Sequence, residues 1–150
     1  MVLYFILRKR LDVPLLFISG YILTNRSDYY RLLAEVTEKN NWKEWILFIL
    51  KGVEEQALFT RDTIVAVKSL IDEYKETAIT NNLPNDASFV DHLFSNAFYT
   101  YNQTAKTLGV HRNTAVTYLK KLEETGVIKS MTVKKELVFY YPKFLDVLSR

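Results

Sequence analysis

The sequence predicts a mainly α-helical protein with a small β-hairpin near its C-terminus. Three observations lead to this fold class. Glycine and proline together number only seven in 150 residues, so long segments lack helix-breaking residues. Apolar residues recur at spacings of three and four along most of the chain, as on one helix face. Near the C-terminus, two short runs rich in β-branched and aromatic residues flank a polar turn, which is typical of a hairpin.

Composition narrows the class of protein. An apolar content of 49% and a charged content of 25% are typical of a globular chain with a real core. Because cysteine is absent and His92 and His111 are the only histidines, we expect no disulfide, no metal centre and a cytoplasmic location. The apolar run at residues 1–7 is far shorter than the about 20 residues of a membrane-spanning helix, so no membrane partner is expected.

The first 80 residues are predicted to be helical. An apolar segment at residues 13–23 contains Pro14 in its first turn, and either Asn25 or Ser27 is expected to cap the next helix. The string WKEWILFILKGVEEQA, at residues 42–57, has an apolar face so wide that we expect burial on most of its surface.

Helical periodicity then continues to residue 76, as one long helix or two stacked ones. The polar string TAITNNLPND, at residues 77–86, is the best linker candidate. The sequence therefore predicts two domains, residues 1–80 and residues 83–150.

The second predicted domain begins with three short helices. Asp86 is expected to cap the first, and the second begins near Thr100. Gly109 lies where the chain must turn sharply, His111 precedes the third helix, and Gly126 ends it. The inward residues of the third helix are spaced four and three apart: Ala115, Leu119 and Leu122.

Two extended runs follow, at residues 127–133 and 137–141, with Lys134, Lys135 and Glu136 between them. They predict a hairpin with a basic tip. Three helices followed by such a hairpin predict a winged helix-turn-helix domain.

The outward surface of this domain suggests contact with duplex DNA. Residues 101–150 hold nine Lys or Arg against four Asp or Glu (+5), whereas residues 1–100 hold eleven against thirteen (−2), which together give +3. Arg and Asn side chains can read base edges, and Lys and Thr can hold phosphates. The candidate DNA-binding residues are Arg112, Asn113, Thr114, Thr117, Lys120, Lys121, Lys134 and Lys135. The alternative is a domain that contacts another protein, with its lysines only solvating the surface.

Two strings in the first 50 residues point to a known family. NRSDYYRLL at residues 25–33 and WKEWILFIL at residues 42–50 resemble the C-terminal portion of the Fic (Fic/DOC) domain. The resemblance covers about residues 1–80 and implies a remnant of the Fic helical bundle. Bacterial Fic proteins often carry a C-terminal winged helix, which fits residues 83–150. Intact members transfer AMP from ATP, with Mg, to a protein hydroxyl.

The resemblance also implies what this chain does not do. The family's catalytic loop, HPFxDGNGR, is not in the sequence, so we expect the chain to be catalytically incomplete, with no catalytic residues and no cofactor of its own. In the alternative, protein-contact role, the winged helix would meet a protein partner or the missing catalytic half. By resemblance, Tyr30 would lie near the nucleotide base in an intact relative; here we expect it to pack in the core. A bundle that lacks half its helices exposes apolar surface, so we expect a dimer or larger assembly.

Overall fold

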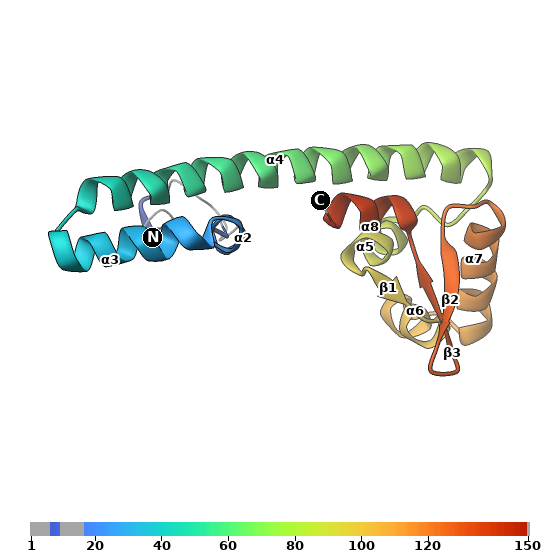
Figure 1. Cartoon of the computed structure of the whole chain (residues 1–150). Coiled ribbons are helices and arrows are strands. Elements are labelled where there is room, and N and C mark those ends of the chain that lie inside the picture. Colours follow the sequence, from blue (N-terminus) through green and yellow to red (C-terminus); the bar gives the residue numbers. More distant parts are fainter. Residues whose placement is uncertain (1–6, 10–16, 150) are drawn as a thin grey trace. The chain divides into compact units, whose positions relative to one another are not determined.

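The computed structural model describes residues 7–9 and 17–149, and within them the chain is mainly helical with a small antiparallel sheet (Figure 1). This confirms the predicted mainly α class. The chain divides into two compact units, Met1–Ile64 and Val65–Arg150, and the boundary falls inside α4 (Trp42–Thr80). Pro14 and residues 1–6 lie outside the described residues. No helix in the described part of the chain is long and apolar enough to cross a bilayer.

In its described residues, the first unit contains α2 (Ser19–Thr24), α3 (Arg26–Lys39) and the beginning of α4. Asn40 ends α3 in the left-handed conformation, with φ of 54°, which asparagine tolerates better than most residues. The chain then turns, and α4 returns alongside α3 (Figure 1).

Within the described residues, the core of the first unit is largely aromatic. Its buried members there are Tyr21, Leu32 and Phe48, and the Tyr21 and Phe48 ring centroids lie 5.1 Å apart. The Tyr21 ring rests directly on α4, because a Cβ atom added to Gly52 would lie 2.5 Å from Tyr21 Cδ1. Glycine at this position therefore permits the close approach of α2 to α4.

Two details of the first unit differ from the predictions. Asn25 is the N-cap residue of α3, but its side-chain amide donates to the Tyr21 carbonyl at 2.9 Å and does not cap the helix. The prediction that α4 is buried on most of its surface is wrong for residues 42–57 of the described chain. Trp42, Ile46 and Leu50 are 52%, 51% and 54% exposed, because α2 and α3 cover only one side of the helix.

As far as residue 149, the second unit combines the end of α4 with four further helices and a three-stranded antiparallel sheet (Figure 1). The elements are α5 (Ala87–Ser95), β1 (Phe98–Tyr99), α6 (Tyr101–Leu108), α7 (Arg112–Glu124), β2 (Lys129–Val133), β3 (Glu136–Tyr140) and α8 (Pro142–Leu148). The strand order is β1-β3-β2, so β3 is central. Tyr140 lies opposite Phe98 on one side and Lys129 on the other.

The predicted helix ends are confirmed in the second unit. Asp86 caps α5 by accepting from the Phe89 N–H at 3.0 Å, and Thr100 caps α6 by accepting from the Gln103 N–H at 3.3 Å. Gly109 ends α6 with φ of 65°, and Gly126 follows α7 with φ of 76°. A side chain would be strained at these positive φ values, so glycine stops both helices at defined residues.

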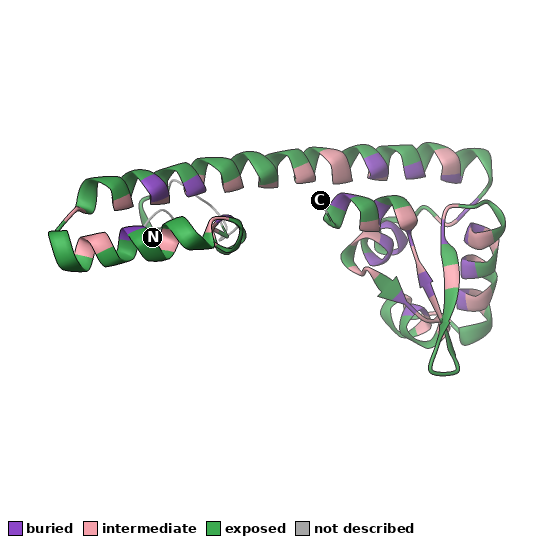
Figure 2. Ribbon diagram, in the orientation of Figure 1, coloured by how far each residue is buried: buried purple, intermediate pink, exposed green. Residues whose placement is uncertain are grey.

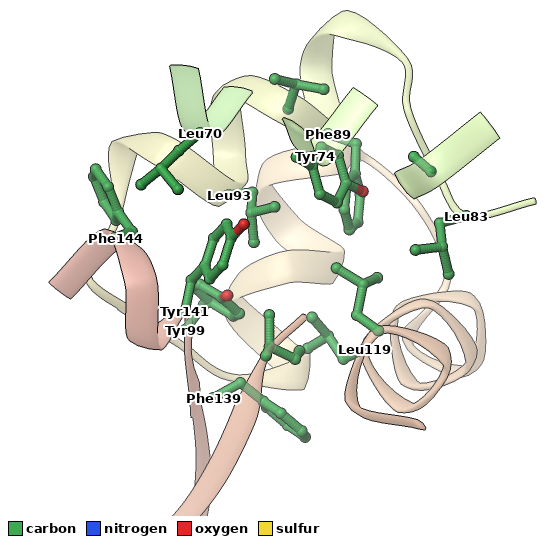
Figure 3. Packing of buried hydrophobic residues seen from close by; sticks show 14 of the residues in the cluster. Leu70, Tyr74, Leu83, Phe89, Leu93, Tyr99, Leu119, Phe139, Tyr141 and Phe144 are labelled. Carbon is green, nitrogen blue, oxygen red and sulfur yellow. The ribbon is translucent and has the colours of Figure 1, made fainter. Parts of the chain in front are cut away.

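The core of the second unit joins the end of α4 to α5, β1, α6, α7, β3 and α8 (Figure 3). Tyr74 is 1% exposed, and its hydroxyl donates to the Pro84 carbonyl. Burial raises the pKa of Tyr74, so this hydroxyl stays a hydrogen-bond donor. Lys143 forms an ion pair with Glu73, which fastens α8 to α4.

Residues 65–80 belong to this core, which places them with the C-terminal unit. The compact units divide between Ile64 and Val65, upstream of the predicted linker at residues 77–86. The domains at residues 1–80 and 83–150 stay a prediction. Periodicity from residue 44 to residue 76 corresponds to one helix, α4. The polar string at residues 77–86 begins inside α4, and its later residues form a short connection anchored by Leu83, which is 6% exposed. Strand β1 and helix α8 were not predicted, although Pro142 at the start of α8 is a helix-start signal.

A buried polar pair links α5 to α6. His92 Nε2 and the Thr104 hydroxyl share a hydrogen bond of 2.9 Å, and the two residues are 2% and 0% exposed. Within the described residues, His92 Nδ1 and the Tyr99 hydroxyl are buried without a hydrogen-bond partner. Burial lowers the pKa of His92, with a small opposing effect of Asp91. A second imidazole proton would have no acceptor, so the core favours the neutral ring.

We predict that His92 makes the second unit less stable in mild acid. Below pH of about 6.5 the unfolded chain binds a proton that the folded imidazole refuses, so the free energy of unfolding falls by up to about 1.4 kcal/mol per pH unit. His92→Gln keeps a polar partner for Thr104 but does not titrate. Urea denaturation at several pH values should show a shallower acid slope for His92→Gln, and identical slopes would contradict the prediction.

Candidate nucleic-acid interface

Helix α7 is held in the second unit by one apolar face. Ala115, Leu119 and Leu122 are each 0% exposed, as the spacing predicted. Tyr118, beside this face, is half-buried and meets Phe89 edge-on at a centroid distance of 5.7 Å. Because this face is buried, the opposite face of α7 must point to solvent, as the burial colours show (Figure 2).

The exposed face carries most of the predicted DNA-contacting residues. Arg112, Asn113, Thr117 and Lys120 are exposed, and Thr114 is half-buried. These side chains are polar or basic and include no large aliphatic group. Their orientation follows from the helical repeat once the inner face is buried.

The start of this face is ordered by two hydrogen bonds. His111 caps α7, since its Nδ1 accepts from the Asn113 N–H at 3.3 Å. Arg112 Nε donates to Asn102 Oδ1 of α6 at 3.0 Å, which places the guanidinium between the two helices. The Asn113 side chain has no partner among the described residues and is therefore available to a ligand.

Lys121 does not share this surface. Its ammonium donates to the Asn82 carbonyl at 2.6 Å, so it ties α7 to the connection that follows α4. At 100° per residue, Lys121 lies a quarter-turn or more from Lys120 and faces the end of α4. The helical repeat of α7 alone does not reveal this contact, because Asn82 lies 39 residues earlier in the chain.

Two exposed residues change the electrostatics of the surface and were not predicted. Lys106 is exposed on α6, one helical turn from Asn102, and it adds a positive charge beside the start of α7. Glu124 is exposed at the other end of the α7 face and adds a negative charge there. Lys106 follows Asn102 by four residues and Glu124 follows Lys120 by four residues, so helical periodicity alone places both side chains on this surface.

The tip of the β2–β3 hairpin is a strained two-residue turn. Val133 pairs with Glu136, which leaves Lys134 and Lys135 as the turn residues. Their φ values are 47° and 71°, the left-handed region that a type I′ turn requires and that normally selects Asn-Gly. Two exposed lysines occupy this left-handed region here, where a lysine backbone is strained. The turn that carries these positive charges is therefore less stable than an Asn-Gly turn would be.

Tyr30 lies in the first unit and is not part of this surface. The prediction that it packs in the core is wrong, because Tyr30 is 55% exposed. Its ring contacts the neighbouring Tyr29 ring and lies 5.6 Å from the Arg26 guanidinium. Tyr29 is the tyrosine of the pair that packs inward, against Trp45 at a centroid distance of 5.3 Å.

We predict that relieving the turn stabilises the protein. The double substitution Lys134→Asn and Lys135→Gly should raise the free energy of unfolding by about 1 kcal/mol, because both new residues accept positive φ. The matched control, Lys134→Gln with Lys135→Gln, removes the same charges and keeps the strain. Thermal denaturation should show a gain for the first variant only; equal gains would mean that charge repulsion is responsible.

This part of the chain matches a known protein family. Residues 70–144 match the family described as "Protein adenylyltransferase SoFic-like, C-terminal domain". The match begins in α4 and ends in α8, so it spans the core of the second unit together with α7 and the hairpin. It covers half of the chain, and the chain therefore belongs to the family of C-terminal domains of SoFic-like protein adenylyltransferases.

Proposed function

We propose that the second unit is a winged helix-turn-helix domain that binds duplex DNA for a Fic-family protein, as a transcriptional regulator. In this proposal α6 and α7 are the helix-turn-helix, and the β2–β3 hairpin is the wing. The observation that carries it is the exposed polar and basic face of α7, with Arg112, Asn113, Thr117 and Lys120, above a fully buried inner face.

Each part of the surface has a chemical role in the proposal. Asn113 can pair with an adenine edge in the major groove, and Arg112 with a guanine or a phosphate. Lys106 and Lys120 hold backbone phosphates on either side of the groove. Lys134 and Lys135 at the wing tip add sequence-independent attraction, which depends on salt. Thr114 and Thr117 serve as smaller contacts at the helix surface.

Neighbouring lysines on α7 provide the sharpest test. Lys120→Gln and Lys121→Gln remove the same charge from adjacent positions, but only Lys120 is free in the described structure to meet phosphate. Lys120→Gln should weaken binding to any duplex and reduce the slope of log K against log salt by about 0.9. Lys121→Gln should leave that slope unchanged and lower the free energy of unfolding by about 0.5–1 kcal/mol.

The measurement is fluorescence anisotropy with a labelled mixed-sequence duplex over a range of salt concentrations, with denaturant unfolding in parallel. Lys68→Gln, an exposed lysine of α4, is the charge control. The proposal fails if the unaltered chain binds no duplex at low salt, or if Lys121→Gln and Lys120→Gln weaken binding equally.

A protein-contact role is the second candidate, and one observation favours it. Phe98, Met131 and Val133 are 46%, 41% and 44% exposed. Cross-strand pairing places Met131, Val133 and Phe98 on the outward face of the sheet, away from Phe139. Such a face suits a protein partner better than DNA. Met131→Lys should then abolish partner binding and leave any DNA affinity intact.

Adenylyl transfer is proposed for an intact family member and not for these 150 residues. The HPFxDGNGR string is absent from the sequence, so no residue here supplies the family's histidine base or phosphate-binding turn. We predict that the chain incubated with labelled ATP, Mg and candidate protein substrates transfers no label. A Fic protein that carries the loop is the positive control, and label incorporated by this chain alone would contradict the assignment.

A further inference from the structure

A stripe of mainly apolar residues, interrupted by one threonine, runs along α4 with regular spacing. In the first unit, steps of four and three residues alternate without a break through Ile46, Leu50, Val53, Ala57, Thr60 and Ile64. Alternating steps of this kind are the a and d positions of a coiled-coil heptad. The stripe therefore has the pattern of a helix seam that packs against another helix.

The same pattern continues into the second unit, where its burial can be seen. The next four positions are Val67, Ile71, Tyr74 and Ala78. Tyr74 and Ala78 are each 1% exposed, and Val67 and Ile71 pack against the core of that unit. In the second unit, therefore, other elements of the same chain pack against the stripe and bury it.

Among the described residues, the stripe in the first unit is only partly covered. Ile46, Leu50 and Ile64 are 51%, 54% and 52% exposed and Ala57 is exposed, whereas Val53 and Thr60 are half-buried. The side of α4 that packs in this unit carries Phe48 and Gly52, against Tyr21. At 100° per residue that side is roughly a third of a turn away from the stripe, so α2 and α3 leave the stripe open.

The charges beside the stripe fit a second copy of the same helix. Glu54 and Arg61 are exposed, lie two turns apart on the flank that points to solvent, and have opposite signs. In an antiparallel pair related by a twofold axis near Ala57, Glu54 of each copy lies opposite Arg61 of the other. A parallel pair would instead set like charges at the same height along the axis. Ala57 at the centre is small enough for two helices to approach closely.

We propose that residues 46–64 of α4 pair antiparallel with α4 of a second copy of this chain, through the apolar stripe and two reciprocal Glu54–Arg61 contacts. In the single chain Arg61 pairs with the adjacent Asp62 at 2.8 Å, an exposed contact that a partner carboxylate can replace at little cost. The seam is under three heptads long, so the dimer is weak and concentration-dependent. The proposal concerns the first unit and does not depend on the proposed function.

Charge reversal tests both the surface and the orientation. Glu54→Arg alone and Arg61→Glu alone each turn two attractive contacts into two repulsive ones, which should weaken dimerisation about tenfold. The double variant, Glu54→Arg with Arg61→Glu, restores opposite charges across the twofold axis and should restore the dimer. Sedimentation equilibrium from about 10 µM to about 1 mM chain measures each dissociation constant.

A matched pair of leucines tests the stripe itself. Leu50 lies on it and Leu58 lies off it, and they are 54% and 46% exposed. Leu50→Glu should abolish the dimer, whereas Leu58→Glu should leave it intact, with circular dichroism confirming that both variants remain helical. Because the chain has no cysteine, Ala57→Cys adds a clean check, since an antiparallel pair should oxidise to a disulfide-linked dimer at this position.

Three results would overturn the proposal. One is an unaltered chain that stays monomeric throughout the concentration range, which would assign the stripe to a different protein or segment. Another is failure of the charge-swapped double variant to recover the dimer. The third is equal loss of dimer in Leu50→Glu and Leu58→Glu.

Discussion

The arrangement of the second unit depends on the contacts made by the buried side chain of Tyr74. Its ring meets the Phe94 ring of α5 at a centroid distance of 6.2 Å, and its hydroxyl donates to the Pro84 carbonyl in the connection to α5. One side chain thus fastens the end of α4, the connection that follows and α5. The hydroxyl bond matters because an unpaired polar group at this depth would oppose folding.

That anchored core in turn fixes what α7 presents to solvent. The fully buried side chains of Ala115, Leu119 and Leu122 leave α7 no freedom to rotate about its axis. Lys121, bonded to Asn82, holds one flank against the end of α4. The polar face with Asn113 and Lys120 is exposed as a consequence. The proposed DNA surface is therefore positioned by residues that would never touch DNA, and a change in the core would disturb it.

The heptad pattern of α4 has different neighbours in the two units. Its heptad seam is buried where the C-terminal unit supplies partners and open where α2 and α3 pack on another side. Among its described residues, the first unit buries three apolar side chains, Tyr21, Leu32 and Phe48. A partner on the open seam would add apolar burial to this unit, and this is the physical reason to propose one.

Sequence alone determined the elements whose signals are local. The caps at Asp86 and Thr100, the turn at Gly109, the inner face of α7 and the hairpin all follow from short-range hydrogen bonding, backbone conformation and periodicity. The sequence also determined the absence of the HPFxDGNGR string. Only the tertiary structure decided that residues 65–80 belong to the C-terminal core, that Lys121 contacts Asn82, that Tyr30 is exposed and that His92 is buried beside Thr104. These depend on which distant segments meet, because burial and side-chain partners arise from long-range packing that no local pattern encodes.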